Sequence, residues 1–300
     1  MILHDCRGKD PFWILSLFEN TSLEAGAKLS LLFEEEEVLR YGYASFVDLA
    51  QLYFFRFCTP TCQDSLVTLC FEKLDTGSSF HNDADAQEKY GVASQFFTIH
   101  KNEKFSFLYN YQKALLFCGV KRKKRILNLG VNRADEFTVI QKMLGDACEN
   151  IEFVGIDYAA SAIEIAKKTF PESNFSFYAH DIKELHTLGL GRFDLIISIG
   201  TLQSSNLNFN ATFMDIYQNY LEEGGAVLLG FPNCRWVDGE MLYGAKAPNY
   251  TFSEMGLLLK DIHFCKKYLQ QKKYRVVVSG KDYIFLSARK ESTTSVPLPK

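Results

Sequence analysis

The second half of the chain carries short, nearly continuous apolar runs that are separated by polar turns and by stretches with helical spacing. The run FDLIISIG is rich in β-branched residues, which is typical of a strand buried on both faces. Strands of this kind that alternate with helices form a mostly parallel sheet, so the pattern predicts an α/β domain. We place the strands within residues 125–137, 151–168, 174–185, 192–203, 224–233, 274–280 and 282–290.

The segment from Arg125 to Asp157 combines the features of a ligand site. An apolar strand runs into a turn at Gly130, a helix follows, and the next strand ends on Asp157. Such a turn brings backbone close to a ligand, and a carboxylate at the end of the next strand can accept hydrogen bonds from two ribose hydroxyls. The G-x-G-x-x-G pattern of dinucleotide sites is absent, because Asn132 and Ala134 occupy the alternating positions after Gly130. The segment therefore predicts a nucleoside cofactor without a pyrophosphate.

The spacing of this turn resembles motif I of the class I S-adenosylmethionine-dependent methyltransferases, in which an acidic residue and any residue precede G-x-G-x-G. Asn128 stands in the place of the acid, and only the first of the three glycines is kept. Asp157 ends the second strand as the ribose-binding acid of this family does, and Asp181 and Ile182 resemble the pair that contacts the adenine. The later apolar runs match the remaining strands in order, so the resemblance covers roughly residues 105–290.

This resemblance implies a Rossmann-like sheet of seven strands, mostly parallel and closed by an antiparallel strand. It also implies S-adenosylmethionine as the cofactor, together with the residues that contact it. These candidate cofactor-binding residues are Asn128, Gly130, Asn132, Asp157, Tyr158, Asp181, Ile182 and Ile199.

Methyl transfer asks little catalytic chemistry of the protein. A sulfonium is already a strong methyl donor, so catalysis is chiefly the alignment of acceptor, methyl carbon and sulfur at near-attack distance. A general base is optional, and we assign no catalytic residue; His180 and Tyr111 are the two candidates that we retain. Strand alternation points His180 to the face opposite Asp181, which favours a surface role for this histidine.

The acceptor side is expected in the loops after the fourth and fifth strands, because ligands of open α/β sheets bind outside the carboxyl ends of the strands. Residues 201–210 lack the N-P-P-Y type signature of enzymes that methylate base amines or glutamine amides. Residues 231–250 are rich in functional groups, and Arg235 could pair an anionic group of the acceptor or else bridge to Asp238 in its own loop. The candidate substrate-binding residues are Tyr109, Asn233, Arg235 and Trp236.

Composition limits the other functions. The formal charge of −3 and the pI near 6.1 give no overall attraction to nucleic acid, and the basic run KRKKR is interpreted as a solvated stretch before a strand. The eight cysteines form no C-x-x-C pair, which fits a reducing cytoplasm. The apolar run PFWILSLF is too short to span a membrane, and Cys58, Cys62 and His81 match no zinc signature, so we expect no membrane anchor and no metal.

Residues 1–104 are expected to form a mainly helical accessory region. The N-T-S sequence from position 20 can cap a helix rich in Leu and Ala, and residues 45–57 have near-helical apolar spacing. Residues 66–74 fit a strand or a helix equally well. Residues 75–91 are dense in turn-forming residues and are expected to be a linker or a mobile loop.

Three parts are therefore expected: an accessory region at 1–104, a methyltransferase domain at 105–290 and a flexible tail at 291–300.

The expected acceptor is a small molecule with an anionic group, because the charge balance is acidic and the candidate recognition loop carries one arginine rather than a basic face. RNA is the alternative acceptor. A non-catalytic protein that binds the cofactor or a partner is the rival from a different class, because three motif I positions depart from the family. The sequence indicates neither the methylated atom nor the oligomeric state.

Overall fold

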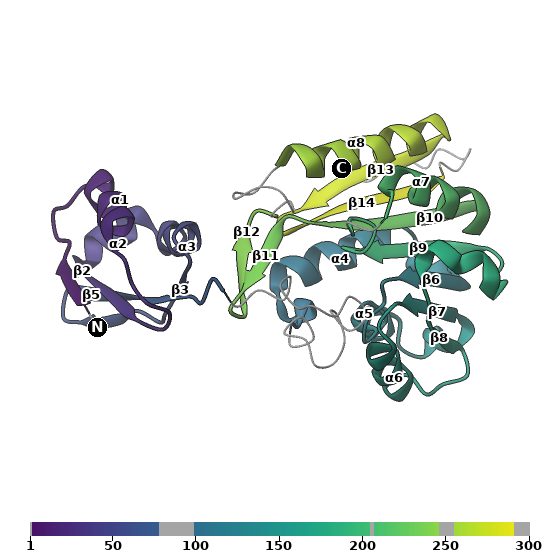
Figure 1. The fold of residues 1–300 in the computed structure, drawn as a ribbon, viewed down its shortest axis with the longest axis horizontal. Coiled ribbons are helices and arrows are strands. Elements are labelled where there is room, and N and C mark those ends of the chain that lie inside the picture. Colours follow the sequence, from purple (N-terminus) through teal and green to yellow (C-terminus); the bar gives the residue numbers. More distant parts are fainter. Residues whose placement is uncertain (1, 78–98, 205–206, 246–254, 291–300) are drawn as a thin grey trace. The chain divides into compact units, whose positions relative to one another are not determined.

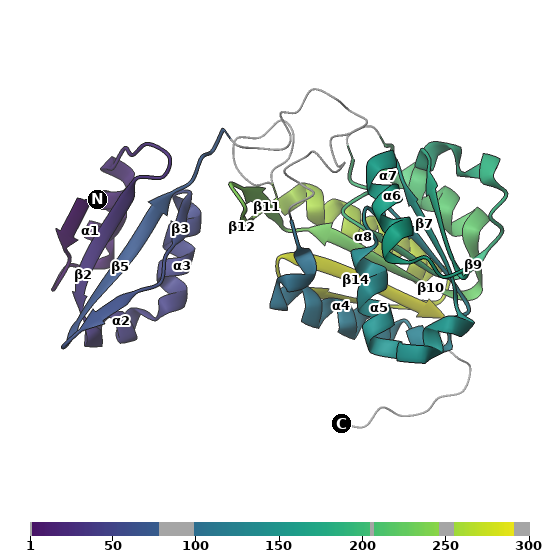
Figure 2. The same cartoon turned by 90° about the horizontal axis from the view of Figure 1, so that it is seen from below.

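The computed structural model describes residues 2–77, 99–204, 207–245 and 255–290. The chain divides into two compact units. The N-terminal unit consists of residues 1–79 with 235–243, and the large unit consists of residues 80–234 with 244–300. Figures 1 and 2 show each unit in two views.

The large unit is built on seven strands, which are β6 (Arg125–Leu129), β7 (Glu152–Asp157), β8 (Phe175–Ala179), β9 (Phe193–Ile199), β10 (Leu221–Pro232), β13 (Tyr274–Gly280) and β14 (Tyr283–Lys290). They form one sheet with the order β13-β14-β10-β9-β6-β7-β8. Neighbouring strands from β8 to β10 run parallel, whereas β14 is antiparallel to both β10 and β13. The predicted Rossmann-like sheet, mostly parallel with an antiparallel closing strand, is therefore confirmed.

Helices cover both faces of this sheet. The helical segments are η3 (Lys101–Glu103), α4 (Phe105–Phe117), η4 (Val120–Arg122), α5 (Asp135–Leu144), η5 (Gly145–Asn150), α6 (Ala160–Thr169), η6 (Ile182–Leu188), α7 (Phe209–Asp215), η7 (Ile216–Tyr220) and α8 (Met255–Gln271). Figure 2 shows α4 and α5 side by side on one face, and α4 packs on β13 and β14. The helices α7 and α8 pack together on the other face.

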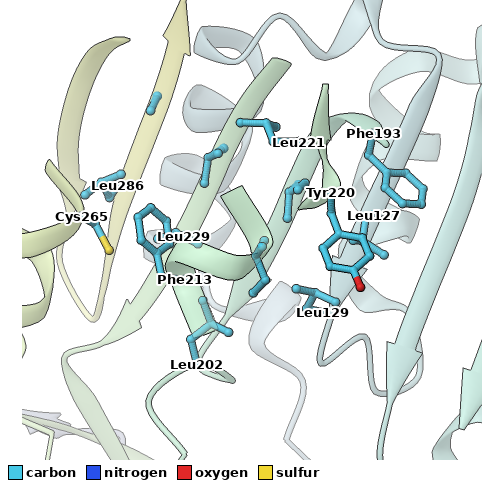
Figure 3. Close-up of a cluster of buried hydrophobic side chains, with 14 of the residues drawn as sticks. Leu127, Leu129, Phe193, Leu202, Phe213, Tyr220, Leu221, Leu229, Cys265 and Leu286 are labelled. Carbon is cyan, nitrogen blue, oxygen red and sulfur yellow. The ribbon is translucent and has the colours of Figure 1, made fainter. Parts of the chain in front are cut away.

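A close-packed apolar cluster lies between the sheet and the helices α7 and α8 (Figure 3). It contains Leu127 and Leu129 of β6, Phe213 of α7 and Cys265 of α8, all of which are buried. Because successive side chains of a strand point to opposite faces, Asn128 points away from this cluster. Asn128 therefore faces the side of the sheet that α4 and α5 cover.

The N-terminal unit also contains a sheet. Its strands within residues 2–77 are β1 (Ile2–Asp5), β2 (Lys28–Glu34), β3 (Phe55–Phe57), β4 (Thr61–Gln63) and β5 (Leu66–Lys73). Its helices there are α1 (Pro11–Asn20), α2 (Glu35–Tyr41) and α3 (Tyr43–Leu52). The strand order is β1-β2-β5-β3, and β4 also pairs with β5.

The expectation of a mainly helical region at 1–104 is therefore corrected. The helix expected after the N-T-S sequence does not form; α1 ends at Asn20 and β2 follows at Lys28. Side chains alternate between buried and less buried along β5, and Val67, Leu69 and Phe71 point into the core with the three helices. This alternation is the period of a half-buried strand, and it decides the 66–74 ambiguity in favour of a strand.

A hairpin inserted late in the sequence completes the N-terminal unit. Its strands are β11 (Cys234–Val237) and β12 (Glu240–Tyr243). Val237 and Leu242 pack with Leu74, and the Arg56 guanidinium donates to Glu240 Oε1 at 2.7 Å and to the Asp238 carbonyl at 3.0 Å. The segment that follows β10 is thus built into the N-terminal unit by an apolar contact and by an arginine.

Three sequence expectations concern residues outside the described ranges. The tail at 291–300 and most of the linker at 75–91 lie there, and so does His81. Among the helices that the structure describes, none has the length and hydropathy to cross a membrane.

Candidate functional site

The order of strands changes direction at β6, since β7 and β8 follow on one side of it and β9 and β10 lie on the other. In open α/β sheets, ligands bind outside the carboxyl ends of the strands at this switch point. The turn at Gly130 follows β6, and Thr201 follows β9. The two loops touch, because a Cβ on Gly130 would lie 1.7 Å from Thr201 Oγ1.

Two physical reasons require glycine at position 130. Its φ of +78° lies in the left-handed region, which side chains disfavour, and Thr201 fills the space that a side chain would need. The N–H groups of Gly130 and Val131 both donate to the Ile156 carbonyl, at 2.8 and 3.0 Å. These bonds tie the turn to β7, so backbone rather than side chains shapes this part of the site.

The two positions that lack the family's later glycines keep a glycine-like backbone. Asn132 has a φ of +47° and Ala134 has a φ of +68°. Asparagine enters this region more readily than most residues, whereas an alanine there carries about 1–2 kcal/mol of strain. Gly130, Asn132 and Ala134 therefore all have a left-handed backbone, although only the first of them is a glycine.

Asp157 lies under this turn at the end of β7 and is 9% exposed. Its Oδ2 accepts a hydrogen bond from the Asn132 N–H at 2.8 Å, and its Oδ1 accepts one from the Ala159 N–H at 3.0 Å. Burial raises the pKa of Asp157, while these backbone bonds and the charge of Lys101 oppose that rise. A carboxylate has about four lone-pair sites, so Asp157 can serve the turn and still accept from a ligand.

The residues expected near the adenine lie at the neighbouring strand ends. Tyr158 is exposed, and the His180 N–H donates to the Asp157 carbonyl, which brings the end of β8 beside β7. Asp181 accepts a hydrogen bond from the Lys183 N–H at 2.9 Å and so caps η6, while Ile182 packs on the apolar cluster.

Ile199 lies at the end of β9, on the side of β6 opposite to β7. It is buried at the end of β9, and a Cβ on Gly230 of β10 would lie 2.7 Å from its side chain. Gly230 therefore lets the two strands pack around Ile199, which forms a firm apolar wall.

Neither catalytic candidate presents a free base. His180 Nε2 lies 3.0 Å from the Glu184 carbonyl and 3.0 Å from Thr187 Oγ1, so its ring is engaged with η6. Tyr111 is fully buried on α4, and burial together with the charge of Glu136 raises its pKa well above the ordinary value. Tyr111 therefore stays a neutral phenol rather than a proton acceptor.

The substrate candidates fall on different elements. Tyr109 is exposed on α4, where the Lys113 ammonium lies 5.5 Å from its ring centre. Asn233 is buried at the end of β10 and donates from Nδ2 to the Lys281 carbonyl at 3.0 Å. Its Oδ1 is buried and accepts no hydrogen bond from the part of the chain that the structure describes.

Arg235 and Trp236 belong to the hairpin of the N-terminal unit. The Arg235 guanidinium lies 5.1 Å from the ring centre of Phe54, and burial lowers the pKa of this arginine. Asp238, the alternative partner considered for Arg235, offers its carbonyl to Arg56 instead. Arg235 thus packs on a ring of its own unit, and Trp236 is buried.

Sequence reasoning missed a largely buried ion pair beside the turn, formed by Lys101 and Glu136. Glu136 is 1% exposed and forms an ion pair with Lys101. The sequence does contain a signal for Glu136, because its helical spacing puts it on the same face as Val139 and Ile140, which are both buried. An acid on the apolar face of a helix indicates a partner or a ligand.

Within the described residues, no group of three His, Cys, Asp or Glu side chains is arranged to hold a metal ion.

Comparison with known proteins identifies the family of this chain. A family model described as "Methyltransferase domain" matches residues 121–279, which include β6 to β10 and α8. Among curated protein sequences, none matches the chain.

Several solved structures resemble the chain at low identity. The DszA carbon methyltransferase is 13% identical, with 93% of this chain and 86% of that chain covered and a TM-score of 0.49. The precorrin-6y C5,15-methyltransferase from Geobacter metallireducens is 12% identical, with 60% and 87% covered and a TM-score of 0.42. The plantazolicin methyltransferase BpumL, in complex with a monoazolic desmethylPZN analog and SAH, is 12% identical, with 64% and 87% covered and a TM-score of 0.42.

Proposed function

Since the chain belongs to the methyltransferase-domain family, we propose that it transfers a methyl group from S-adenosylmethionine to a small molecule that carries an anionic group. The observation that carries this proposal is the turn after β6. Its backbone has positive φ at all three glycine positions of motif I, and it is bonded directly to Asp157.

The residues of the site fit a nucleoside cofactor. Gly130 gives the turn its left-handed backbone and leaves room for Thr201 of the loop after β9, so the two loops meet at the switch point. Asp157 retains acceptor capacity for two ribose hydroxyls, and Asp181, Ile182 and Tyr158 are the groups proposed to border the adenine. The bound cofactor would supply an activated methyl group, which needs no further activation by the protein.

The chain's own contribution is then to bind and to orient. The turn and Asp157 fix the nucleoside, and Ile199 provides an apolar wall at the switch point. Alignment of two reactants by rigid elements supplies most of the catalysis for a displacement of this kind. A general base is optional for this displacement, and the ring of His180 is bonded to η6 while Tyr111 is a buried neutral phenol.

The acceptor is assigned by chemistry rather than by name. Asn233 ends β10 with a buried, unpartnered Oδ1 among the described residues, and it can accept a hydrogen bond from an acceptor molecule. Tyr109 is exposed on α4. Arg235 and Trp236 remain proposed contacts, and in that role Arg235 would pair the anionic group.

All eight cysteines are free, which supports a reducing compartment and hence the proposed cytoplasmic location.

Calorimetric titration of Asp157→Ala tests the proposed site. The variant loses the acceptor for the ribose hydroxyls, so we expect S-adenosylmethionine to bind at least about tenfold more weakly, as loss of a charge-assisted hydrogen bond predicts. Asp194→Ala is the matched control, because Asp194 also accepts two backbone N–H bonds, from Lys124 and Arg125, at the opposite edge of the sheet. Equal affinities in Asp157→Ala and the unmodified protein would remove Asp157 from the site.

A further inference from the structure

Three buried polar side chains lie on the face of the sheet that α4 and α5 cover. They are Tyr111, Asn128 and Glu136, which are 0%, 0% and 1% exposed. The Tyr111 hydroxyl and both amide atoms of Asn128 have no hydrogen-bond partner among the described residues. Burial of polar atoms without partners is costly, so such a group points to a ligand that completes it.

The Lys101–Glu136 ion pair lies beside these side chains. The Glu136 oxygens accept no other hydrogen bond from the described part of the chain. The Lys101 side chain is 13% exposed, and its ammonium lies 5.8 Å from the ring centre of Phe107. A buried ion pair stabilises a fold only when further hydrogen bonds satisfy its remaining donors and acceptors, and the Glu136 oxygens lack such bonds within the described residues.

The packing of η3 places this pair next to the turn. Lys101 lies on η3, which packs on both α4 and α5. Glu136 is the second residue of α5, directly after the turn. The pair therefore lies beside the turn that is bonded to Asp157, where η3, α4 and α5 meet.

The Lys101–Glu136 pair also supplies a carboxylate near the position where motif I lacks its acid. Asn128 stands where the family has an acid, and an amide cannot offer a negative charge. Glu136 brings a carboxylate to the same face of the sheet, eight positions later in the chain. The charge that motif I lacks is thus restored from the next helix.

We propose that Glu136, in place of Asn128, receives the ammonium of the cofactor's amino-acid end, and that Lys101 receives its carboxylate. This inference rests on the proposed function. An α-amino acid presents one positive and one negative group, which the Glu136–Lys101 pair complements with opposite signs. Tyr111 and Asn128 lie on the same covered face of the sheet as neutral hydrogen-bonding groups, and both are positioning residues for this end of the ligand.

The competing account is a purely structural pair that anchors η3 to α5. Asn102 supports that account, because its Nδ2 donates to the Asp135 carbonyl at 2.8 Å and already joins these segments. The two accounts differ in what they predict for ligands. A structural pair is indifferent to the amino-acid end, whereas a binding pair distinguishes ligands that have this end from ligands that lack it.

Calorimetry with two ligands separates the accounts. S-adenosylhomocysteine carries the amino-acid end, and 5′-methylthioadenosine has the same nucleoside without it. We expect Glu136→Gln and Lys101→Met to weaken S-adenosylhomocysteine at least tenfold and to leave 5′-methylthioadenosine within twofold. Glu152→Gln is the matched control, since Glu152 is also paired, with Arg125, but at the opposite edge of the sheet, and it should change neither affinity.

The double variant Lys101→Met/Glu136→Gln keeps the test decisive if a single variant leaves an unpaired charge and fails to fold. It should fold and should bind the two ligands with similar affinity. Equal weakening of both ligands, or unchanged binding of S-adenosylhomocysteine, would overturn the inference while the proposed function stands. Failure of the unmodified protein to bind either ligand would instead overturn the proposed function.

Discussion

Single residues decide the shape of the turn after β6, and Ala134 has the least favourable backbone angle of them. Its φ of +68° is one that alanine rarely adopts, and it lies at the N-terminus of α5. Sequence comparison with motif I counts Asn132 and Ala134 as departures, because a motif records side chains and not dihedral angles. The structure shows a left-handed backbone at both positions.

Replacement of Ala134 by glycine measures the strain in the turn directly. Glycine relieves about 1–2 kcal/mol of left-handed strain, which offsets the lost methyl burial and the greater freedom of the unfolded chain. Ala162→Gly is the matched control, because Ala162 is equally buried but lies within α6. We expect Ala134→Gly to cost about 1–2 kcal/mol less than Ala162→Gly in urea unfolding. Equal costs would show that Ala134 is unstrained.

The buried acids of the site give ligand binding a pH dependence. Burial raises the pKa of Asp157 above 3.8 and that of Glu136 above 4.5, against the opposing effect of Lys101. A carboxyl whose pKa is raised by folding contributes stability below its unfolded pKa and loses that contribution as pH rises through the folded pKa. Binding has the opposite sign, because ribose hydroxyls and an ammonium favour the carboxylate form.

We therefore expect S-adenosylhomocysteine affinity to fall as the pH is lowered through the raised pKa values, with proton release on binding. Calorimetry in two buffers of different ionisation enthalpy, between about pH 5 and pH 8, measures both quantities. An affinity that stays constant or rises on acidification would contradict the assignment of these carboxylates to the site.

At the scale of elements, the sequence predicted the large sheet well and the N-terminal unit poorly. The apolar runs of β6 and β9 are continuous because both faces of these strands are buried, and this is a strong signal. Residues 28–34 and 66–73 alternate instead over a few positions, and so short a pattern does not separate a strand from a helix. The hairpin at 235–243 joins this unit from 156 positions after Ser79, which local patterns cannot reveal.

The hairpin depends on Arg56, and this dependence can be measured. Arg56 is half-buried and binds Glu72, Glu240 and the Asp238 carbonyl. We expect Arg56→Ala to destabilise the N-terminal unit by about 2 kcal/mol and to speed amide exchange in β11 and β12, since hydrogen bonds to charged groups are lost. Arg7→Ala removes an exposed pair with Asp5 and should leave amide exchange in β11 and β12 unchanged. Unchanged exchange in β11 and β12 would show that the apolar contacts alone hold the hairpin.

At the scale of the whole molecule, the candidate site could be predicted in part. Strand order brings Gly130, Asp157 and Ile199 to one sheet edge; the turn and the strand-end acid predicted the first two, and the family resemblance implied the third. The Lys101–Glu136 pair depends on the packing of η3 against α5, which no local spacing encodes. The substrate candidates Asn233 and Arg235, two positions apart, belong to different units.

Transfer of a labelled methyl group tests the central claim most directly. The protein is incubated with methyl-labelled S-adenosylmethionine and a fractionated cell extract, and the label is followed into small molecules, RNA and protein. The account predicts label in an anionic small-molecule fraction with the unmodified chain and with Asp194→Ala, and a large loss of it with Asp157→Ala. A protein that binds S-adenosylmethionine in calorimetry but leaves every fraction unlabelled would contradict methyl transfer and would identify a cofactor-binding protein without the activity.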